Sequence, residues 1–107
     1  MTGHAVTARF NQQVVELTSL VSVRLADPDA LSAVVVAAAS AVGMSAHGPP
    51  QVRAGPAGIA VGMLCRDGHI VLHTAPDEGI CFIDVAARAP IRVGKAIEII
   101  ARRLLAG

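Results

Sequence analysis

The strongest constraint on the fold of this chain is a pair of apolar runs with an Asp-Gly pair between them. The runs are GIAVGMLC, residues 58–65, and HIVLHTA, residues 69–75, and Asp67-Gly68 separates them. Asp and Gly tolerate the positive φ angles of a two-residue hairpin turn. The sequence therefore predicts an antiparallel β-hairpin whose turn is Asp67-Gly68.

Further strands are predicted on both sides of this hairpin. The segment GICFIDVAA, residues 79–87, alternates in the manner of a strand. Its two faces are expected to carry Ile80, Phe82 and Asp84 on one side and Cys81, Ile83 and Val85 on the other.

The segments nearer the N-terminus give weaker signals. HAVTARF, residues 4–10, reads as a first strand. VVELTSLVSVRL, residues 14–25, is ambiguous, although the alternation over residues 21–25 favours a strand there. HGPPQVRAGPAG, residues 47–58, is rich in Pro and Gly, which predicts a loop or at most an irregular edge strand.

Two segments carry the marks of helices. In residues 27–43, Asp27 suits the N-cap, Pro28 the first helical position, and Gly43 a left-handed C-terminal cap. In residues 90–107, one apolar stripe is traced by Val93, Ala96, Ile97, Ile100 and Leu104. On the outer side of this second helix, Glu98 and Arg102 are spaced to form an ion pair.

These elements together predict the fold class. A chain of 107 residues makes one domain, residues 1–107. Strands, a helix, several antiparallel strands and a final helix indicate an α+β protein. We expect a two-layer α/β sandwich, an antiparallel sheet with its two main helices on one face.

Composition excludes several classes of function. Aromatic residues are 2% of the chain, with no Trp or Tyr, so little is present to stack on a base. The net charge of +1 and the lack of a basic block argue against nucleic-acid binding. No apolar run is long enough to span a membrane, and the N-terminus does not resemble a signal peptide, so we expect a cytoplasmic protein.

The cysteines and histidines have spacings that argue against a metal site. Cys65 and Cys81 lack a zinc-like spacing and are expected to be buried and reduced. His69 and His73 lie on one face of a strand about 13 Å apart, too far to share an ion. His73 precedes Asp77 and Glu78, either of which is a candidate partner for an acid–base histidine.

The stretch GIAVGMLCRDGHIVLHTAPDEGICFIDV, residues 58–85, resembles the core of the bacterial S-adenosylmethionine decarboxylases. In that family a strand leads into a Glu-Ser pair, then His-x-x-x-His-Thr, a Pro-Glu pair, a glycine turn and a strand that ends in Asp-Val or Asp-Leu. The residues of this chain in register with that pattern are His69, His73, Thr74, Pro76, Gly79 and Asp84. Weaker similarity extends to the predicted first strand and to both helices. The resemblance implies a two-layer α/β sandwich that dimerises.

The resemblance also implies a chemistry from which this chain departs. The family cleaves itself between Glu and Ser, and the Ser becomes the pyruvoyl group that acts as electron sink. Asp67 and Gly68 stand at those positions, and glycine has no hydroxyl. The other departures from the family's functional residues fall at or near Ala54, Ala60, Ala75, Asp77 and Arg88. Of the processing and catalytic set only His73 is retained, so we expect no pyruvoyl cofactor.

Three hypotheses for the function follow. The first is a repurposed, non-pyruvoyl enzyme of lyase, cyclisation or proton-transfer type that acts on an amino-acid-like or related metabolite. Its catalytic residues are His73, Asp77 and Glu78, and its substrate-binding candidates are Asp67, Gly68, His69, Thr74 and Asp84. The second is a non-catalytic homologue that acts as a binding or partner-regulating dimer. The third is a true decarboxylase matured at another residue, such as Cys65 or Thr74. S-adenosylmethionine itself is a poor candidate ligand, because so few aromatic residues are present.

Overall fold

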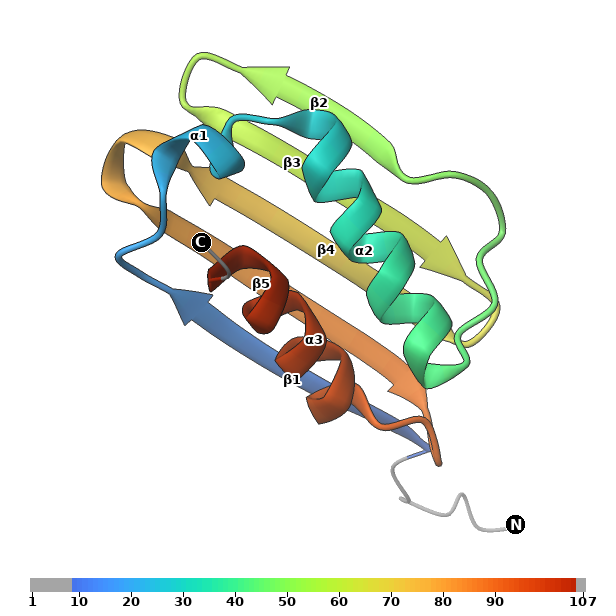
Figure 1. Ribbon diagram of the computed structural model, residues 1–107. Coiled ribbons are helices and arrows are strands. Elements are labelled where there is room, and N and C mark those ends of the chain that lie inside the picture. Colours follow the sequence, from blue (N-terminus) through green and yellow to red (C-terminus); the bar gives the residue numbers. More distant parts are fainter. Residues whose placement is uncertain (1–8, 106–107) are drawn as a thin grey trace, which may run out of the picture.

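The computed structural model describes residues 9–105 of the chain, and the helices and strands follow the order expected of an α+β protein. Figure 1 shows their arrangement. The elements are β1 (Phe10–Leu17), α1 (Ser22–Leu25), α2 (Pro28–Val42), β2 (Gln51–Gly55), β3 (Gly58–Cys65), β4 (Gly68–Ala75), the 3-10 turn η1 (Pro76–Glu78), β5 (Ile80–Arg88) and α3 (Val93–Leu105).

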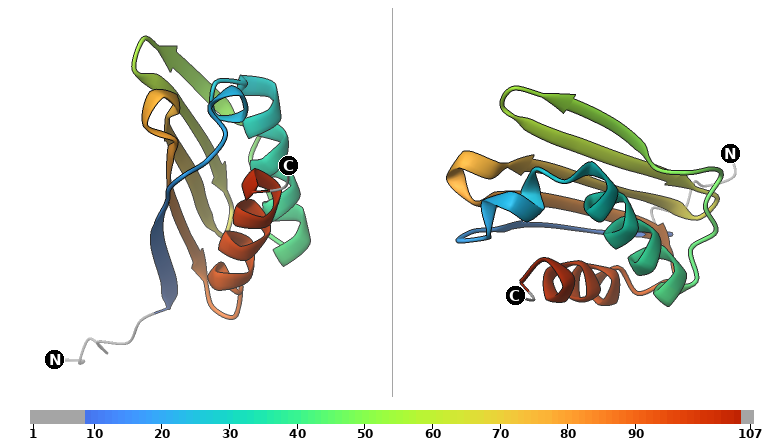
Figure 2. Two further views of the ribbon diagram at one scale, coloured as in Figure 1. Left: turned by 60° about the vertical axis from the view of Figure 1, so that its left-hand side comes forward. Right: turned by 45° about the horizontal axis from the view of Figure 1, so that its top comes forward.

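The described strands form one antiparallel sheet in the order β1-β5-β4-β3-β2. Strands β2 to β5 are a meander of successive neighbours, and β1 pairs with β5 at one edge. Helices α1, α2 and α3 all lie on the same side of the sheet (Figure 2). The predicted two-layer sandwich is therefore confirmed, and no helix of residues 9–105 lies over the other face of the sheet.

Helix α2 begins and ends as its sequence predicts. The Asp27 carboxylate accepts hydrogen bonds from the backbone N–H groups of Asp29 and Ala30, both at 3.1 Å. These bonds satisfy two of the amides that the first turn leaves without a helical partner. Gly43 closes the helix at φ 80°, in the left-handed region that glycine adopts at little cost.

The N-terminal expectations need correction. The strand predicted for residues 4–10 lies mostly outside the described residues, and β1 occupies Phe10–Leu17 instead. The strand favoured over residues 21–25 is wrong, because Ser22–Leu25 is a single helical turn. Only Leu25 is buried there, while Val21 and Val23 are exposed, so the alternation does not reflect a buried face. The edge-strand alternative for residues 47–58 is confirmed by β2.

The hairpin between β3 and β4 forms, but its turn lies one residue earlier than predicted. Cys65 pairs with Gly68, so the turn is Arg66-Asp67. Gly68 is needed for a different reason: a Cβ there would lie 1.9 Å from the Ala86 carbonyl oxygen, at φ 155°. The close approach of β5, and not the turn itself, excludes a side chain at this position.

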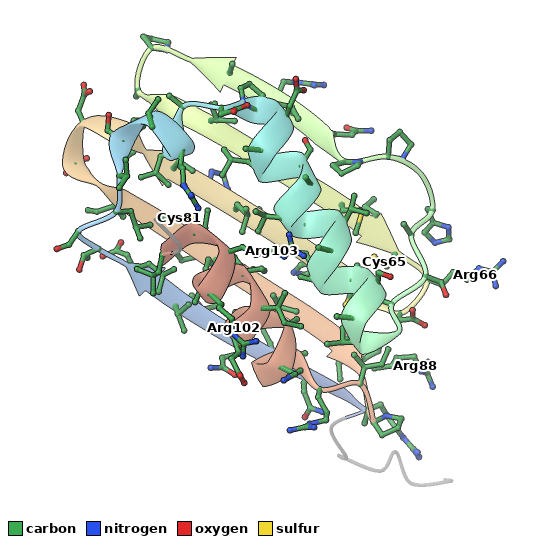
Figure 3. The ribbon with its side chains drawn as sticks, viewed as in Figure 1. Cys65, Arg66, Cys81, Arg88, Arg102 and Arg103 are labelled. Atoms are coloured by element: carbon green, nitrogen blue, oxygen red, sulfur yellow. The ribbon has the colours of Figure 1, made fainter. Side chains whose placement is uncertain are left out.

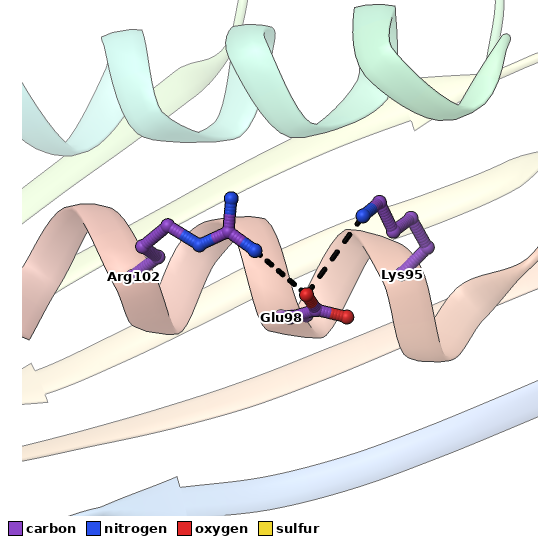
Figure 4. Close-up of polar contacts among 3 residues, drawn as sticks. All are labelled: Lys95, Glu98 and Arg102. Carbon is purple, nitrogen blue, oxygen red and sulfur yellow. Dashed lines mark hydrogen bonds and ion pairs between the residues drawn. The ribbon is translucent and has the colours of Figure 1, made fainter.

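The core between sheet and helices is aliphatic, as the scarcity of aromatics predicts. Its largest fully buried side chains are Leu25, Leu31, Val35, Val61, Met63, Ile70, Leu72, Cys81, Ile83, Val85 and Ile100. The whole predicted stripe of α3 is buried. On the outer side of α3, Glu98 binds Arg102 at 2.7 Å and Lys95 at 3.8 Å (Figure 4). None of the described helices is long and apolar enough to cross a membrane.

Candidate functional site

The open face of the sheet carries most of the polar residues that the sequence singles out. On β4, the alternating burial turns Ile70, Leu72 and Thr74 to the helices and His69 and His73 to the open face. On β5, Cys81 and Ile83 are buried against the helices, so Phe82 and Asp84 share the open face with the histidines. The strand alternation predicted for residues 80–85 is therefore confirmed.

His73 lies in a shallow pocket at the end of the sheet nearest η1. Its imidazole is exposed and its ring centre is 6.1 Å from that of Phe82. The pocket has a volume of about 480 Å³ and is lined by Arg53, Ala54, Gly55, Ala57, Gly58, Ile59, Ala60, His73, Thr74, Ala75 and Glu78. Arg53, His73 and Glu78 thus line one hollow, whose other lining residues are small or apolar, apart from Thr74. The Arg53 guanidinium donates a hydrogen bond of 3.0 Å to the Val52 carbonyl oxygen.

The two carboxylates predicted to orient His73 lie in η1, next to the end of its strand. Glu78 lines the same pocket as His73, whereas Asp77 does not. Within residues 9–105, no hydrogen bond or ion pair joins His73 to either carboxylate. The acid–base pairing of His73 with Asp77 or Glu78 stays a prediction.

His69 belongs to a second polar group on the open face. Its Nε2 lies 3.4 Å from Asp84 Oδ1, and the same carboxylate oxygen accepts a hydrogen bond of 3.0 Å from Gln12 Nε2. The three residues come from neighbouring strands, β4, β5 and β1. This group explains the carboxylate in the middle of β5: Asp84 has two polar partners and is not an isolated charge.

Asp67 and Gly68 lie at the opposite end of β4 from His73. His73 is five positions along the strand from Gly68, which corresponds to roughly 16 Å. The Asp67 carboxylate accepts a hydrogen bond of 2.7 Å from the Ser45 backbone N–H. It thereby ties the β3–β4 turn to the loop that follows α2. A single protomer does not bring this turn and His73 into one site.

Thr74 points to the helix side of the sheet and has a structural role. Its hydroxyl donates to the Leu25 carbonyl oxygen at 2.8 Å and accepts from the Ile59 N–H at 3.1 Å. The residue is 7% exposed. It joins β3, β4 and α1, and its hydroxyl is engaged by these partners, although Thr74 is among the residues that line the pocket.

Both cysteines lie on the helix side of the sheet, and neither is positioned as a reactive thiol (Figure 3). Burial raises the pKa of the Cys81 thiol to about 12. Burial, with a smaller contribution from the Asp67 carboxylate, raises the pKa of Cys65. A raised pKa keeps the thiol protonated and therefore weakly nucleophilic. Within the described residues no group of three potential ligands could hold a metal ion.

Sequence reasoning missed two residues of these sites, Arg53 and Gln12. Both lie on edge strands whose registers are not visible in the sequence: Arg53 pairs with Ala60 across β2 and β3, and Gln12 pairs with Ala86 across β1 and β5. The alternation within QVRAG indicates that Arg53 shares a face with Gln51 and Gly55. It does not indicate that β2 pairs with β3, which is what brings Arg53 beside Ala60.

The fold and the site together define a class: an antiparallel α/β sandwich whose open face carries the His-x-x-x-His strand. A family model described as S-adenosylmethionine decarboxylase matches residues 11–107. This chain belongs to the S-adenosylmethionine decarboxylase family.

The fold is similar to that of a solved structure. The crystal structure of the adenosylmethionine decarboxylase from Aquifex aeolicus VF5 matches with a TM-score of 0.78. The match covers 87% of this chain and 78% of that chain, at 16% sequence identity. At this identity the likeness shows the fold alone. No curated protein sequence gives a significant match to the chain.

The residues at the family's cleavage position do not fit a pyruvoyl group. The resemblance aligns the family's serine with Gly68, which has neither the hydroxyl nor the Cβ from which that group is made. The backbone has also closed over the position, because Ala86 and Ala87 occupy the space that a Cβ would need.

Proposed function

We propose that this protein is a family member that does not cleave itself, and that it uses the pocket around His73 to act on a small amino-acid-like metabolite. The reaction is of lyase, cyclisation or proton-transfer type, with His73 as the acid or base. The observation that carries the proposal is that Arg53, His73 and Glu78 line one hollow of about 480 Å³.

The charges around the pocket suit a zwitterionic ligand. The Arg53 guanidinium is a natural partner for a carboxylate, and the Glu78 carboxylate is one for an ammonium group. His73 is exposed, and its neighbours across the sheet are Ala60 on β3 and Phe82 on β5. The small side chain of Ala60 leaves room for a ligand to reach the imidazole, which is the geometric requirement for proton transfer.

The absence of self-cleavage rests on the chemistry of glycine. An N-to-O acyl shift requires a side-chain hydroxyl, and Gly68 has none. Amino-acid decarboxylation needs an electron sink, which a protein must supply itself or take from a cofactor. We therefore place the activity among reactions that an imidazole, a guanidinium and a carboxylate can support. Maturation at Cys65 or Thr74 is disfavoured, because the first is buried and the second has its hydroxyl engaged.

We further propose that the protein works as a cytoplasmic homodimer. Phe10, Val14 and Leu64 lie on the open face of the sheet and are 52%, 50% and 71% exposed. Large apolar side chains on a face without a covering layer favour association with a second copy. The two unpaired, buried cysteines suit a reducing compartment such as the cytoplasm.

The second candidate is a non-catalytic homologue that binds a ligand or regulates a partner. It is favoured by the lack, within residues 9–105, of a carboxylate bonded to His73. A catalytic histidine is usually held in position by a hydrogen bond to another side chain, such as a carboxylate. The two candidates can be told apart by replacing His73, because only an enzyme would lose catalytic activity.

The first experiment is the intact mass of the purified protein under denaturing conditions. A single species near 10.9 kDa is expected. Two fragments, one carrying a pyruvoyl terminus, would show that maturation occurs at an unforeseen residue and would overturn the proposal.

The second experiment is a screen of amino acids and their small derivatives for turnover, followed by variants of the two histidines. His73→Gln is expected to lower kcat by about 100-fold or more, the range typical of a lost acid or base. His69→Gln is the matched control on the same face of the same strand. Binding without turnover, unchanged by His73→Gln, would favour the non-catalytic homologue.

A further inference from the structure

Beyond its first turn, helix α2 has no charged side chain on the face that it turns away from the sheet. From Ala30 to Val42 the helix contains only Ala, Val, Leu and Ser, and the outward-facing Val36 is 48% exposed. A surface helix normally presents charged or polar residues to water, and a helix that is apolar all round is normally covered. The outer face of α2 is therefore expected to have a covering partner.

Helix α3 lies beside α2 and forms a wall of a different character (Figure 1). Lys95 and Arg102 lie on the side of α3 that faces α2, and Glu98 binds both of them (Figure 4). Arg92 and Arg103 are exposed, and no acidic side chain of residues 9–105 lies within ion-pair distance of either. At 1.5 Å per helical residue these two arginines are about 16 Å apart along α3. The wall thus keeps two cations that are not neutralised.

Three hollows follow one another between α2 and α3. The first lies beside Ala30 and Arg103, the second beside Ala37, Ala41 and Arg103, and the third beside Ala41 and Arg92. Their volumes are about 270, 460 and 390 Å³. Neighbouring hollows share Arg103 or Ala41, so together they form one groove along the helix pair, the α2–α3 groove.

The shape and charge of the α2–α3 groove select its occupant. A row of hollows suits a helix, because side chains on successive turns of a helix can enter successive hollows. The uncharged wall suits an apolar stripe, and the wall with Arg92 and Arg103 suits carboxylates. A lipid surface is a poorer match. Of the described residues, α2 contributes a single exposed large apolar side chain, Val36, whereas membrane association relies on several protruding Trp, Phe or Leu side chains.

We propose that the α2–α3 groove is the docking site for an acidic amphipathic helix of a partner protein, with its apolar stripe against α2 and its carboxylates at Arg92 and Arg103. Residues 1–8, MTGHAVTA, contain no Asp or Glu and so do not supply this charge. The groove lies on the opposite side of the sheet from the open face, so a second copy on that face leaves it free (Figure 2). The proposal does not rest on the proposed function.

The experiment titrates the full-length protein into a fluorescein-labelled synthetic peptide and follows fluorescence anisotropy. The probe is an amphipathic helix with a leucine stripe and glutamates along one edge, and a second peptide carries glutamine at each glutamate position. The glutamate peptide is expected to bind saturably, about tenfold tighter than the glutamine peptide, and more weakly as salt is raised. Amide resonances followed by NMR are expected to shift at Ala37, Ala41 and Ile99.

Variants of the two walls locate the binding. Arg103→Gln is expected to weaken binding of the glutamate peptide about threefold to fivefold, the factor of an exposed ion pair, and Arg92→Gln with Arg103→Gln about tenfold or more. Ala37→Lys places a long cationic side chain in the middle hollow and is expected to weaken binding about tenfold. Arg66→Gln is the matched control, because it removes an exposed arginine from the β3–β4 turn, away from the groove (Figure 3). It is expected to leave binding within about twofold of wild type.

Four results would overturn the proposal. The glutamate peptide gives no saturable binding, or the glutamine peptide binds equally well. The double arginine variant, folded by thermal unfolding, binds the glutamate peptide as wild type does. Ala37→Lys converts a larger assembly to a smaller one in sedimentation, which would make the groove a contact between copies of this chain. The protein ignores the peptide but binds vesicles of phosphatidylcholine and phosphatidylserine through Arg103, which would make the occupant a lipid surface.

Discussion

Replacing Gly68 by serine puts back the residue that the family uses for cleavage, and we expect it to damage the fold without restoring cleavage. An ideal Cβ at this position would lie 1.9 Å from the Ala86 carbonyl oxygen and 2.8 Å from the Ala87 Cα. Ordinary contact begins at 3.4 Å, and the obstructing atoms are backbone, so β5 or the β3–β4 turn has to move.

The cost of Gly68→Ser has two sources. A side chain at φ 155° adds backbone strain of about 1–3 kcal/mol. Forcing atoms into a packed position adds about 1–3 kcal/mol more. The movement also threatens the hydrogen bond of 2.8 Å from the Arg88 N–H to the Asp67 carbonyl oxygen. We expect a loss of roughly 2–6 kcal/mol, a large fraction of the stability of a domain this size.

The assay combines thermal unfolding, followed by circular dichroism, with intact mass. Gly68→Ser is expected to lower Tm by roughly 10 °C or more and to remain a single uncleaved species. Gly62→Ser is the matched control, because a Cβ there meets nothing within 4 Å and its cost stays below about 1 kcal/mol. A Gly68→Ser protein that is as stable as wild type, or that splits into two chains, would refute the reasoning.

Three further predictions concern single side chains. Thr74→Val removes a buried hydroxyl that serves two backbone partners, and urea unfolding should show a loss of about 1–3 kcal/mol; an unchanged midpoint would contradict the role assigned to it. Burial raises the pKa of Cys81 from 9.0 to about 12, so the unfolded chain releases this proton first. Stability from this thiol is complete below pH 9 and falls between pH 9 and 12. Cys81→Ala should flatten that decline in unfolding free energy, and an equally steep decline would count against it. Glu98→Gln removes two exposed ion pairs on α3 and should cost less than about 1 kcal/mol, with a smaller effect in high salt; a salt-independent loss would point to another cause.

Much of the fold follows from local patterns in the sequence. The caps of α2 depend on Asp27, Pro28 and Gly43, and each acts on amides or dihedral angles within a few residues of itself. The buried stripe of α3 and the alternation of β5 likewise depend only on helical and strand periodicity. The strand prediction for residues 21–25 failed because five residues are too few to fix a period: Val21 and Val23 are exposed, and Ser22–Leu25 forms a helical turn that buries only Leu25.

The candidate site was only half visible in the sequence. His73 and Glu78 lie close in the chain, so their placement in one pocket was predictable. Arg53 joins them because the register of β2 on β3 sets it beside Ala60. The meeting of His69 with Asp84 likewise depends on the register of β4 on β5. Register is fixed by long-range pairing, and no local pattern encodes it.

The glycines of the hairpin separate what the sequence determined from what the tertiary structure decided. The sequence alone determined that Gly68 has no hydroxyl for self-cleavage, because that is a property of the residue itself. Only the tertiary structure decided that β5 closes over Gly68, while the space above Gly62 stays open. The physical reason is that a glycine's backbone preferences are local, whereas the volume around its Cα is set by strands and loops that arrive from elsewhere in the chain.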